Sequence, residues 1–141
     1  MNKKQILLVA ILLFASLNIS YAQYFYPVLG TFTRDKKEKI DRNYTTNLES
    51  NYDCVVEASL AIVTMVKLDL PADEMPMLKA KIEDLVTSGA SPVIRYKAYI
   101  ASAVFNNPMI FKRESTRNYE NSNELFGALA ERLSYTLLSS N

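Results

Sequence analysis

The feature that most constrains the fold is an apolar run of 12 residues in the middle of the chain, from Val55 to Val66. Glu57 is its only charged residue, and its other polar side chains are the small hydroxyls of one serine and one threonine. Apolar residues recur at spacings of three and four, which is the period of an α-helix. The run is shorter than the roughly 20 residues that span a bilayer. The sequence therefore predicts a central core helix over residues 52–70, surrounded by other helices.

Two apolar stripes run side by side along this predicted helix. The first contains Leu48, Tyr52, Val55, Ser59, Ile62, Val63 and Val66, and the second contains Cys54, Ala58, Ala61 and Met65. Cys54 is the only cysteine of the chain, so an intrachain disulfide is excluded. Its place in a stripe predicts a buried, unreactive thiol, with a disulfide to another chain as the alternative.

The chain begins with a pattern typical of a secretory signal peptide. Two lysines precede an apolar run over residues 6–17, and residues 20–22 place small side chains at the positions that signal peptidases require. We expect cleavage between Ala22 and Gln23, which removes residues 1–22 and leaves the length of one domain. An uncleaved membrane anchor is the alternative. The mature protein is therefore expected to be periplasmic or secreted, without a stable membrane anchor.

The composition argues against several classes of function. The leader contains two lysines and no acidic residue, so its removal changes the net charge from +1 to −1. This balance gives no electrostatic reason to expect binding to nucleic acid or anionic lipid. The chain has no histidine, the commonest general base and a common zinc ligand. Its three glycines are too scattered to form a phosphate-binding loop. We therefore expect neither catalysis nor a metal or cofactor site.

An arm and a charged segment separate the leader from the core helix. Residues 23–32 are rich in aromatic side chains but interrupted by a proline and a glycine, which favours an extended arm over a central strand. The arm is expected either to lie in a groove between helices or to contact a partner. Residues 34–42 interleave charges of both signs, which is typical of a solvated linker or a first helical turn. We assign residues 23–46 to the arm and linker, and residues 47–141 to a helical domain.

Two helices are predicted to follow the core helix. Asp73 is a candidate N-cap for an amphipathic helix that ends at Gly89, with the glycine expected in the left-handed conformation. Ser91 and Pro92 then provide a cap and a first helical residue for a helix over residues 92–106.

The C-terminal part is predicted to contain one more main helix. Residues 109–113 are expected to form a short helical turn and residues 115–121 a surface loop. Asn121 and Glu124 form a capping-box-like pair that opens the last helix. No convincing alternating pattern follows the leader, so we predict an all-α fold with about four main helices in antiparallel pairs, either HEAT-like or an orthogonal bundle.

Residues 90–108, with the sequence ASPVIRYKAYIASAVFNNP, resemble the inner half of a HEAT repeat. The positions that match are Pro92, Val93, Arg95, Ala98, Ala101 and Asn107-Pro108. The core helix and the helix after it resemble a preceding pair of the same kind. The resemblance implies a stacked helical scaffold whose usual function is to bind proteins.

Two sets of residues are candidate functional residues. Glu57 lies in the apolar core helix, where a carboxylate must be paired, hydrogen-bonded or protonated. Arg95 is its predicted partner in a buried ion pair, and the alternative is that Glu57 only marks the rim of the helix. Tyr96 and Tyr99 are three residues apart, so their rings share a face of one helix. With Arg95 and Lys97 they form the candidate interaction patch.

These features predict a small exported helical protein that binds an unknown protein partner in the cell envelope or outside the cell. The alternative is a binder of a small apolar ligand held between the helices, in a cavity lined by methionines. The methionines concerned are Met65, Met75, Met77 and Met109. An exposed tyrosine-rich patch favours the first function, an enclosed apolar pocket the second, and two carboxylates across a cleft an enzyme.

Overall fold

The computed structural model describes residues 34–139, and every regular element in that range is a helix. The elements are α2 (Arg34–Leu48), α3 (Asp53–Asp69), α4 (Pro76–Ser88), α5 (Pro92–Asn106), the 3-10 helix η2 (Pro108–Thr116) and α6 (Ser122–Ser139). The all-α prediction is confirmed for this range, with six helices rather than four. The predicted signal peptide and aromatic arm, residues 1–32, lie outside the described residues.

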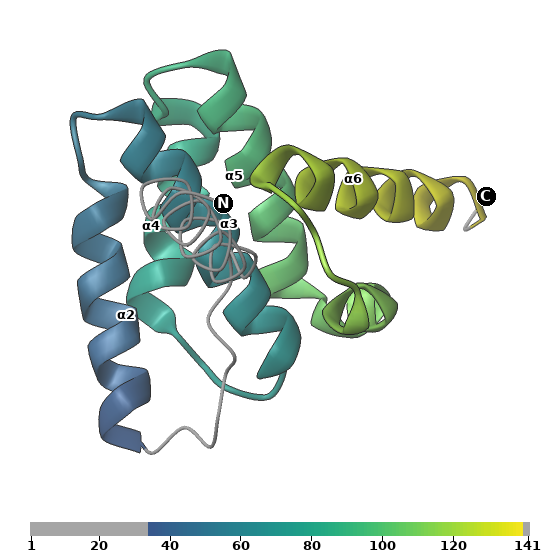
Figure 1. Ribbon diagram of the computed structural model, residues 1–141, viewed down its shortest axis with the longest axis horizontal. Helices are drawn as coiled ribbons and strands as arrows, with labels where there is room; N and C mark the ends of the chain where they lie inside the picture. The colour runs from purple at the N-terminus through teal and green to yellow at the C-terminus, as the bar shows by residue number, and fades with distance from the viewer. Residues whose placement is uncertain (1–33, 140–141) are drawn as a thin grey trace, which may run out of the picture.

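Helices α2 to α5 form two antiparallel pairs that stack on each other (Figure 1). Within the pairs α2 contacts α3 and α4 contacts α5, and between the pairs α2 contacts α4 and α3 contacts α5. The loops that join the two helices of each pair lie at the same end of this stack, at the top of Figure 1. Helices η2 and α6 follow and contact both α3 and α5. This arrangement is compatible with a helical repeat-like fold.

The predicted core helix is α3, and its neighbours enclose its C-terminal half. Its buried residues are Val56, Ser59, Leu60, Ala61, Val63, Thr64, Met65, Val66, Lys67 and Leu68. The start of the helix is different, because Tyr52 is 72% exposed and the thiol of Cys54 is also exposed. The prediction of a buried cysteine is therefore wrong. Helical periodicity identifies a face of α3 but does not show how far the neighbouring helices extend along it.

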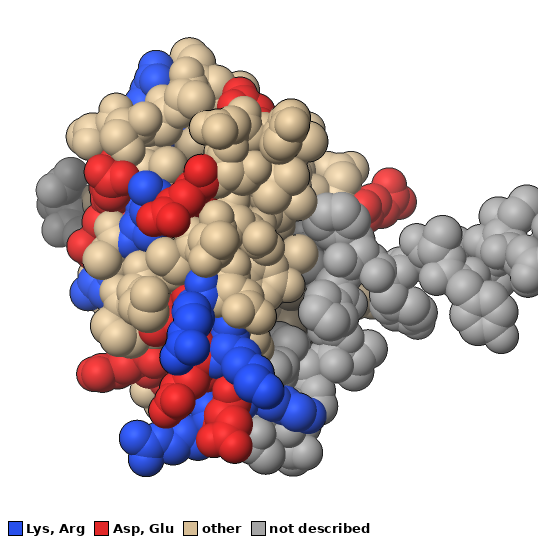
Figure 2. Space-filling view, turned by 90° about the vertical axis from the view of Figure 1, so that its left-hand side faces the viewer, with Lys and Arg blue, Asp and Glu red and all other residues tan. Residues whose placement is uncertain are grey.

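Of the two alternatives for the charged segment over residues 34–42, the helical one is correct, because the segment is the first part of α2 and not a linker. Figure 2 shows side chains of both signs next to each other on the lower part of this side of the molecule, where the N-terminal half of α2 lies. Arg34 and Glu38, one helical turn apart, form one such exposed pair at 3.3 Å. The buried residues of α2 are Asp41 and Leu48. The helical domain thus includes α2, whereas the sequence placed its start at residue 47.

Helix α2 also holds the start of α4, which has no side-chain cap at its own N-cap position. The Asp41 carboxylate accepts hydrogen bonds from the backbone N–H groups of Leu78, at 2.8 Å, and Met77, at 3.3 Å. Asp73, the predicted cap, instead pairs with Lys37 of α2 at 2.6 Å. The cap of α4 therefore comes from a residue distant in the sequence.

The turn between α4 and α5 brings the two helices into close contact at Gly89. This glycine has φ −55°, so the predicted left-handed conformation is wrong. A Cβ atom at Gly89 would lie 2.8 Å from the carbonyl oxygen of Leu85 and 2.9 Å from Cγ2 of Ile94, so the turn requires a residue without a side chain. The predicted cap of α5 is confirmed, because Ser91 Oγ accepts from the Ile94 N–H at 3.2 Å.

The predicted cap of α6 at Asn121 is also confirmed, whereas Glu124 binds the residue before the cap and does not complete a capping box. Asn121 Oδ1 accepts from the backbone N–H groups of Asn123 and Glu124, each at 3.0 Å. The Glu124 carboxylate in turn accepts from the backbone N–H of Glu120 at 2.7 Å. Before this helix, η2 runs to Thr116 and is longer than the predicted turn over residues 109–113.

Candidate functional site

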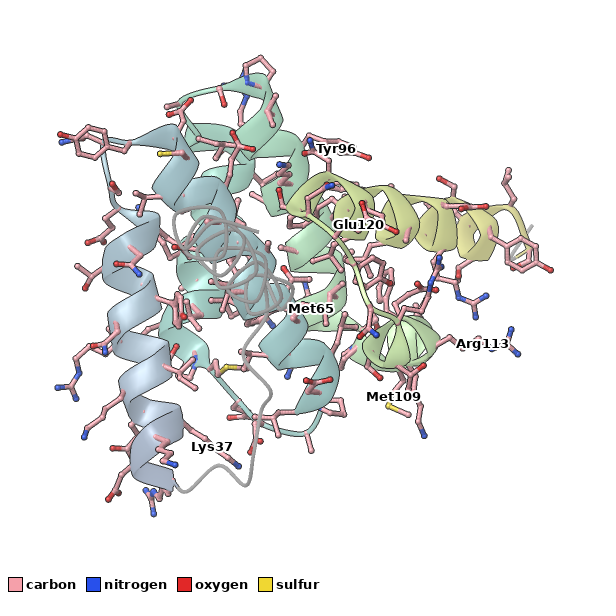
Figure 3. The ribbon with its side chains drawn as sticks, viewed as in Figure 1. Lys37, Met65, Tyr96, Met109, Arg113 and Glu120 are labelled. Carbon is pink, nitrogen blue, oxygen red and sulfur yellow. The ribbon has the colours of Figure 1, made fainter. Side chains whose placement is uncertain are left out.

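The exposed face of α5 carries three apolar side chains at a spacing of three residues. Val93, Tyr96 and Tyr99 are 48%, 50% and 51% exposed. Residues at this spacing are neighbours on a helix, so the three form one continuous surface, named here the α5 strip. Figure 3 shows Tyr96 on the surface close to the start of α6. The two tyrosines are therefore the accessible part of the predicted interaction patch.

Lys97, the third residue of the predicted patch, points into the protein. It is 3% exposed, and its Nζ donates to Glu57 Oε2 at 2.6 Å and to Ser122 Oγ at 3.2 Å. The same Nζ lies 5.7 Å from the centroid of the Phe126 ring, in range for a cation–π contact. Lys97 therefore links α3, α5 and α6, and its place in a surface patch is a wrong prediction.

Arg95 does not pair with Glu57, so the predicted ion pair has the wrong cation. Its guanidinium donates to the carbonyl oxygen of Gly89 at 2.7 Å and closes the turn between α4 and α5. Residues two apart on a helix differ in direction by about 200°. When Lys97 faces α3, Arg95 must therefore face elsewhere. The sequence located the carboxylate that needs a partner but not the residue that supplies it.

A pocket of about 250 Å³ lies at the end of the stack where the two loops meet. Its apolar lining consists of Leu48, Val56, Leu85, Ala90 and Ile94, and its polar lining of Glu49, Ser50, Asn51, Asp53, Lys81 and Ser88. Lys81 is paired with Asp84 at 3.1 Å. The carboxylates of Glu49 and Asp53 have no hydrogen-bond or ion-pair partner among residues 34–139. The sequence did not indicate this pocket, because three separate segments form it.

The four methionines proposed to line a ligand cavity do not line this pocket. Met65 and Met75 are buried in the core, whereas Met77 and Met109 are 48% and 63% exposed. Figure 3 shows Met65 on α3 and Met109 on the outer side of η2. Their separation gives no support to a methionine-lined cavity.

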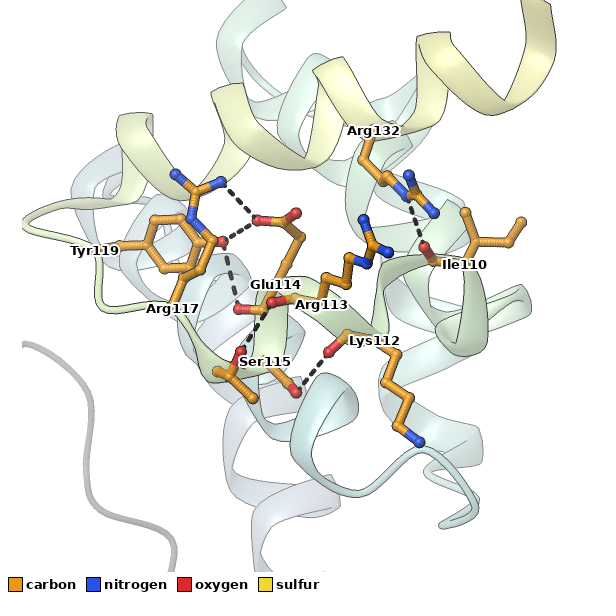
Figure 4. Close-up of polar contacts among 9 residues, drawn as sticks. Ile110, Lys112, Arg113, Glu114, Ser115, Arg117, Tyr119 and Arg132 are labelled. Atoms are coloured by element: carbon orange, nitrogen blue, oxygen red, sulfur yellow. Dashed lines mark hydrogen bonds and ion pairs between the residues drawn. The ribbon is translucent and has the colours of Figure 1, made fainter. Parts of the chain in front are cut away.

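A polar cluster closes the connection from η2 to α6 (Figure 4). The Tyr119 hydroxyl donates to the Glu114 carboxylate at 2.6 Å, and Arg117 lies 3.1 Å from the same carboxylate. Burial raises the pKa of Tyr119 above its ordinary value, and the hydrogen bond to Glu114 and the charge of that carboxylate raise it further. Arg132 of α6 donates to the carbonyl oxygen of Ile110 at 3.0 Å. These contacts fix η2 against α6.

A second buried lysine holds the turn after α3. Lys67 is 7% exposed and donates to the carbonyl oxygens of Pro71, at 3.0 Å, and Asp73, at 2.8 Å. Burial lowers the pKa of Lys67, and the charges of Asp73 and Glu74 partly oppose this shift. The contacts go to the backbone of the turn, which assigns Lys67 to the fold rather than to a binding surface.

Within the described range, no group of three or more metal-ligating side chains is placed to hold an ion. None of the helices described there is long and apolar enough to cross a membrane. Comparison of the chain with protein-family models, curated proteins and solved structures gives no significant match.

Proposed function

We propose that this protein is a protein–protein interaction module that binds its partner through the α5 strip. The observation that carries the proposal is that two half-exposed tyrosines and a valine lie on one face of one helix. Tyrosine combines a large apolar ring with a hydroxyl that hydrogen-bonds, and it is enriched among residues that dominate binding energy.

The rigid setting of α5 supports this role. The opposite side of the helix is buried, and α5 contacts α3, α4, η2 and α6. The Lys97–Glu57 ion pair and the Arg95–Gly89 hydrogen bond hold it in place at the strip. Because α5 is already held in place, the protein loses little conformational entropy when a partner binds the strip. This favours affinity.

The stacking of the helix pairs supports a HEAT-like scaffold as the finer description of the fold. The first helices of the two pairs contact each other, and so do the second helices. Together with the resemblance over residues 90–108, this favours a short array of repeat-like pairs that presents one helix face to a partner. The leader pattern in turn supports export, so we place the partner in the cell envelope or outside the cell.

Site-specific photo-crosslinking in the native host tests this function. A benzophenone amino acid at position 99 is expected to crosslink one dominant protein, and the same amino acid at position 52 is not. Tyr52 is a suitable control because it is 72% exposed and lies immediately before α3, outside the strip. Tyr96→Ser with Tyr99→Ser should abolish binding to the purified partner without changing the circular dichroism spectrum. Equal crosslinking from both positions, or none from position 99, would contradict the proposal.

A further inference from the structure

The exposed face of α5 carries an uncharged row of residues along the whole helix. Arg95 and Lys97 are the only charged residues of α5, and both are engaged within the protein, with the Gly89 carbonyl oxygen and with Glu57. The row advances in alternating steps of four and three, the spacing of helices that pair along their length. We name it the α5 seam; its residues are Pro92, Tyr96, Tyr99, Ala103 and Asn106. All of them are exposed except Ala103, which is partly buried.

The α5 seam lies at the end of the stack of helix pairs. The side of α5 that faces α3 is marked by Lys97, which binds Glu57, and by Phe105, whose ring centroid lies 5.9 Å from Lys67 Nζ. Successive side chains point about 100° apart on a helix, so the seam points in the opposite direction from these two residues. It therefore occupies the place where a further helix pair would stack on α5.

The composition of the seam is unlike that of a closed end. In arrays of helix pairs, terminal units carry a polar outer face that keeps them soluble. The first six residues of α2, residues 34–39, are all charged and form a surface of this polar kind. The seam instead presents two half-exposed tyrosine rings and no charge. This composition favours coverage of the seam by another surface.

The seam has the chemistry to pair with a second copy of itself. In a twofold-symmetric contact the same surface meets itself, so a charge near the axis would meet a like charge, and the seam has none. The sizes of its residues also match when the two helices run antiparallel. Tyr99 of one copy then lies over Ala103 of the other, and Tyr96 lies over Asn106. Each large ring meets a smaller side chain, so the two surfaces interdigitate.

We infer that the protein forms a twofold-symmetric dimer through the α5 seam, with the two α5 helices antiparallel. This inference rests on the proposed function, because it identifies the partner of the α5 strip as a second copy of the protein. One face of a helix of 15 residues is small for a protein interface, so the dimer is weak. The contact closes on itself, so association stops at the dimer.

Sedimentation velocity of the mature chain, residues 23–141, over a range of concentrations tests the inference. Every protein carries Cys54→Ser, so that the exposed thiol cannot join two copies. The mass should rise with concentration to that of a dimer and no further. Tyr99→Glu and Ala103→Lys should each weaken association at least about tenfold, equivalent to about 1.4 kcal/mol, because each places an unpaired charge in the contact.

Two checks separate loss of the contact from loss of the fold. Circular dichroism and the thermal midpoint establish that each variant is folded. The matched control is Asn43→Glu and Asn47→Lys, which introduce the same charges at the same spacing on exposed positions of α2. Neither control should change association. Tyr96→Ser with Tyr99→Ser, which adds no charge, is a second seam variant and should also weaken the dimer.

A mixture of the Tyr99→Glu and Ala103→Lys variants gives the decisive result. In the antiparallel alignment the new carboxylate of one copy meets the new ammonium of the other, and the native tyrosine and alanine meet on the other side of the axis. The mixture should therefore form a dimer at concentrations where neither variant does so alone. A parallel alignment places position 99 beside position 99, so it gives the mixture no ion pair.

Three results would overturn the inference: a monomer at all concentrations, an oligomer larger than a dimer, or a mixture that associates no better than its components. The crosslinking experiment then separates this failure from failure of the proposed function. The proposed function survives if position 99 still crosslinks a different protein in the host. Both fail if position 99 crosslinks nothing.

Discussion

Lys97 Nζ lies 2.6 Å from Glu57 Oε2, and the lysine is much the more buried partner, with its side chain 4% exposed against 30% for Glu57. Loss of Glu57 would leave a buried ammonium with only the Ser122 hydroxyl as an acceptor. Loss of Lys97 would leave a carboxylate that water can reach. The two halves of this ion pair are therefore not equivalent for stability.

We predict that Glu57→Gln lowers the free energy of unfolding by about 2 kcal/mol, and that Lys97→Met lowers it by less. The double variant should recover part of the loss from Glu57→Gln, because no charge is then left without a partner. Urea unfolding of the four proteins measures these differences. A larger loss for Lys97→Met than for Glu57→Gln would show that burial of the ammonium does not control the energetics.

The cap that α2 provides for α4 predicts a graded series at Asp41. Asp41→Ala leaves the N–H groups of Met77 and Leu78 without their acceptors and should cost about 2 kcal/mol. Asp41→Asn keeps one acceptor oxygen and should cost less. Glu38→Ala, in the same helix, removes only an exposed pair and should cost below about 0.5 kcal/mol. Equal thermal midpoints for the alanine variants at positions 41 and 38 would contradict this role.

The two glycines in the described helical region predict opposite effects of the same substitution. Gly89→Ala should destabilise the protein by about 1–3 kcal/mol, because the new Cβ meets the backbone oxygen of Leu85. Gly127→Ala should stabilise it by about 0.5–1 kcal/mol, because this position lies within α6 with nothing near its Cβ. Differential scanning calorimetry of both variants checks the signs. A stabilising Gly89→Ala would show that the turn relaxes without cost.

The raised pKa of Tyr119 predicts a loss of stability at alkaline pH. Below pH 10.0, the ordinary pKa of tyrosine, the hydroxyl is protonated in both the folded and the unfolded state, and its stabilisation is complete. Above that pH the unfolded state releases the proton and the folded state retains it, so the free energy of unfolding falls. The stability difference between the wild type and Tyr119→Phe should therefore shrink as the pH rises from 9 towards 11. A constant difference in urea unfolding over that range would rule this out.

Local signals predicted much of the secondary structure correctly. Apolar spacing located α3, and the Ser91 cap with Pro92 located the start of α5, because both signals depend on residues within a few positions of each other. Helix α2 was missed because its first six residues, 34–39, are all charged. Ile40, Tyr44 and Leu48 repeat at a spacing of four and pack on the core, and this stripe was the available signal.

The candidate sites were only partly predictable. Tyr96 and Tyr99 share a face whatever the helix packs against, so spacing placed them together, but only the packing of α5 decided that this face is exposed. The pocket was not predictable, because it joins the end of α2, the start of α3 and the turn between α4 and α5. Residues so far apart in the sequence give no periodic signal.

The sequence by itself determined that the chain forms helices, where most of them begin and end, and that Glu57 needs a partner. Only the tertiary structure decided that the partner is Lys97 and not Arg95, that Asp41 caps α4, and that Cys54 reaches solvent. The physical reason is the geometry of helices. Successive side chains of a helix point about 100° apart, so the way its neighbouring helices pack decides which side chains meet. That selection depends on contacts between residues far apart in the chain, which no local pattern contains.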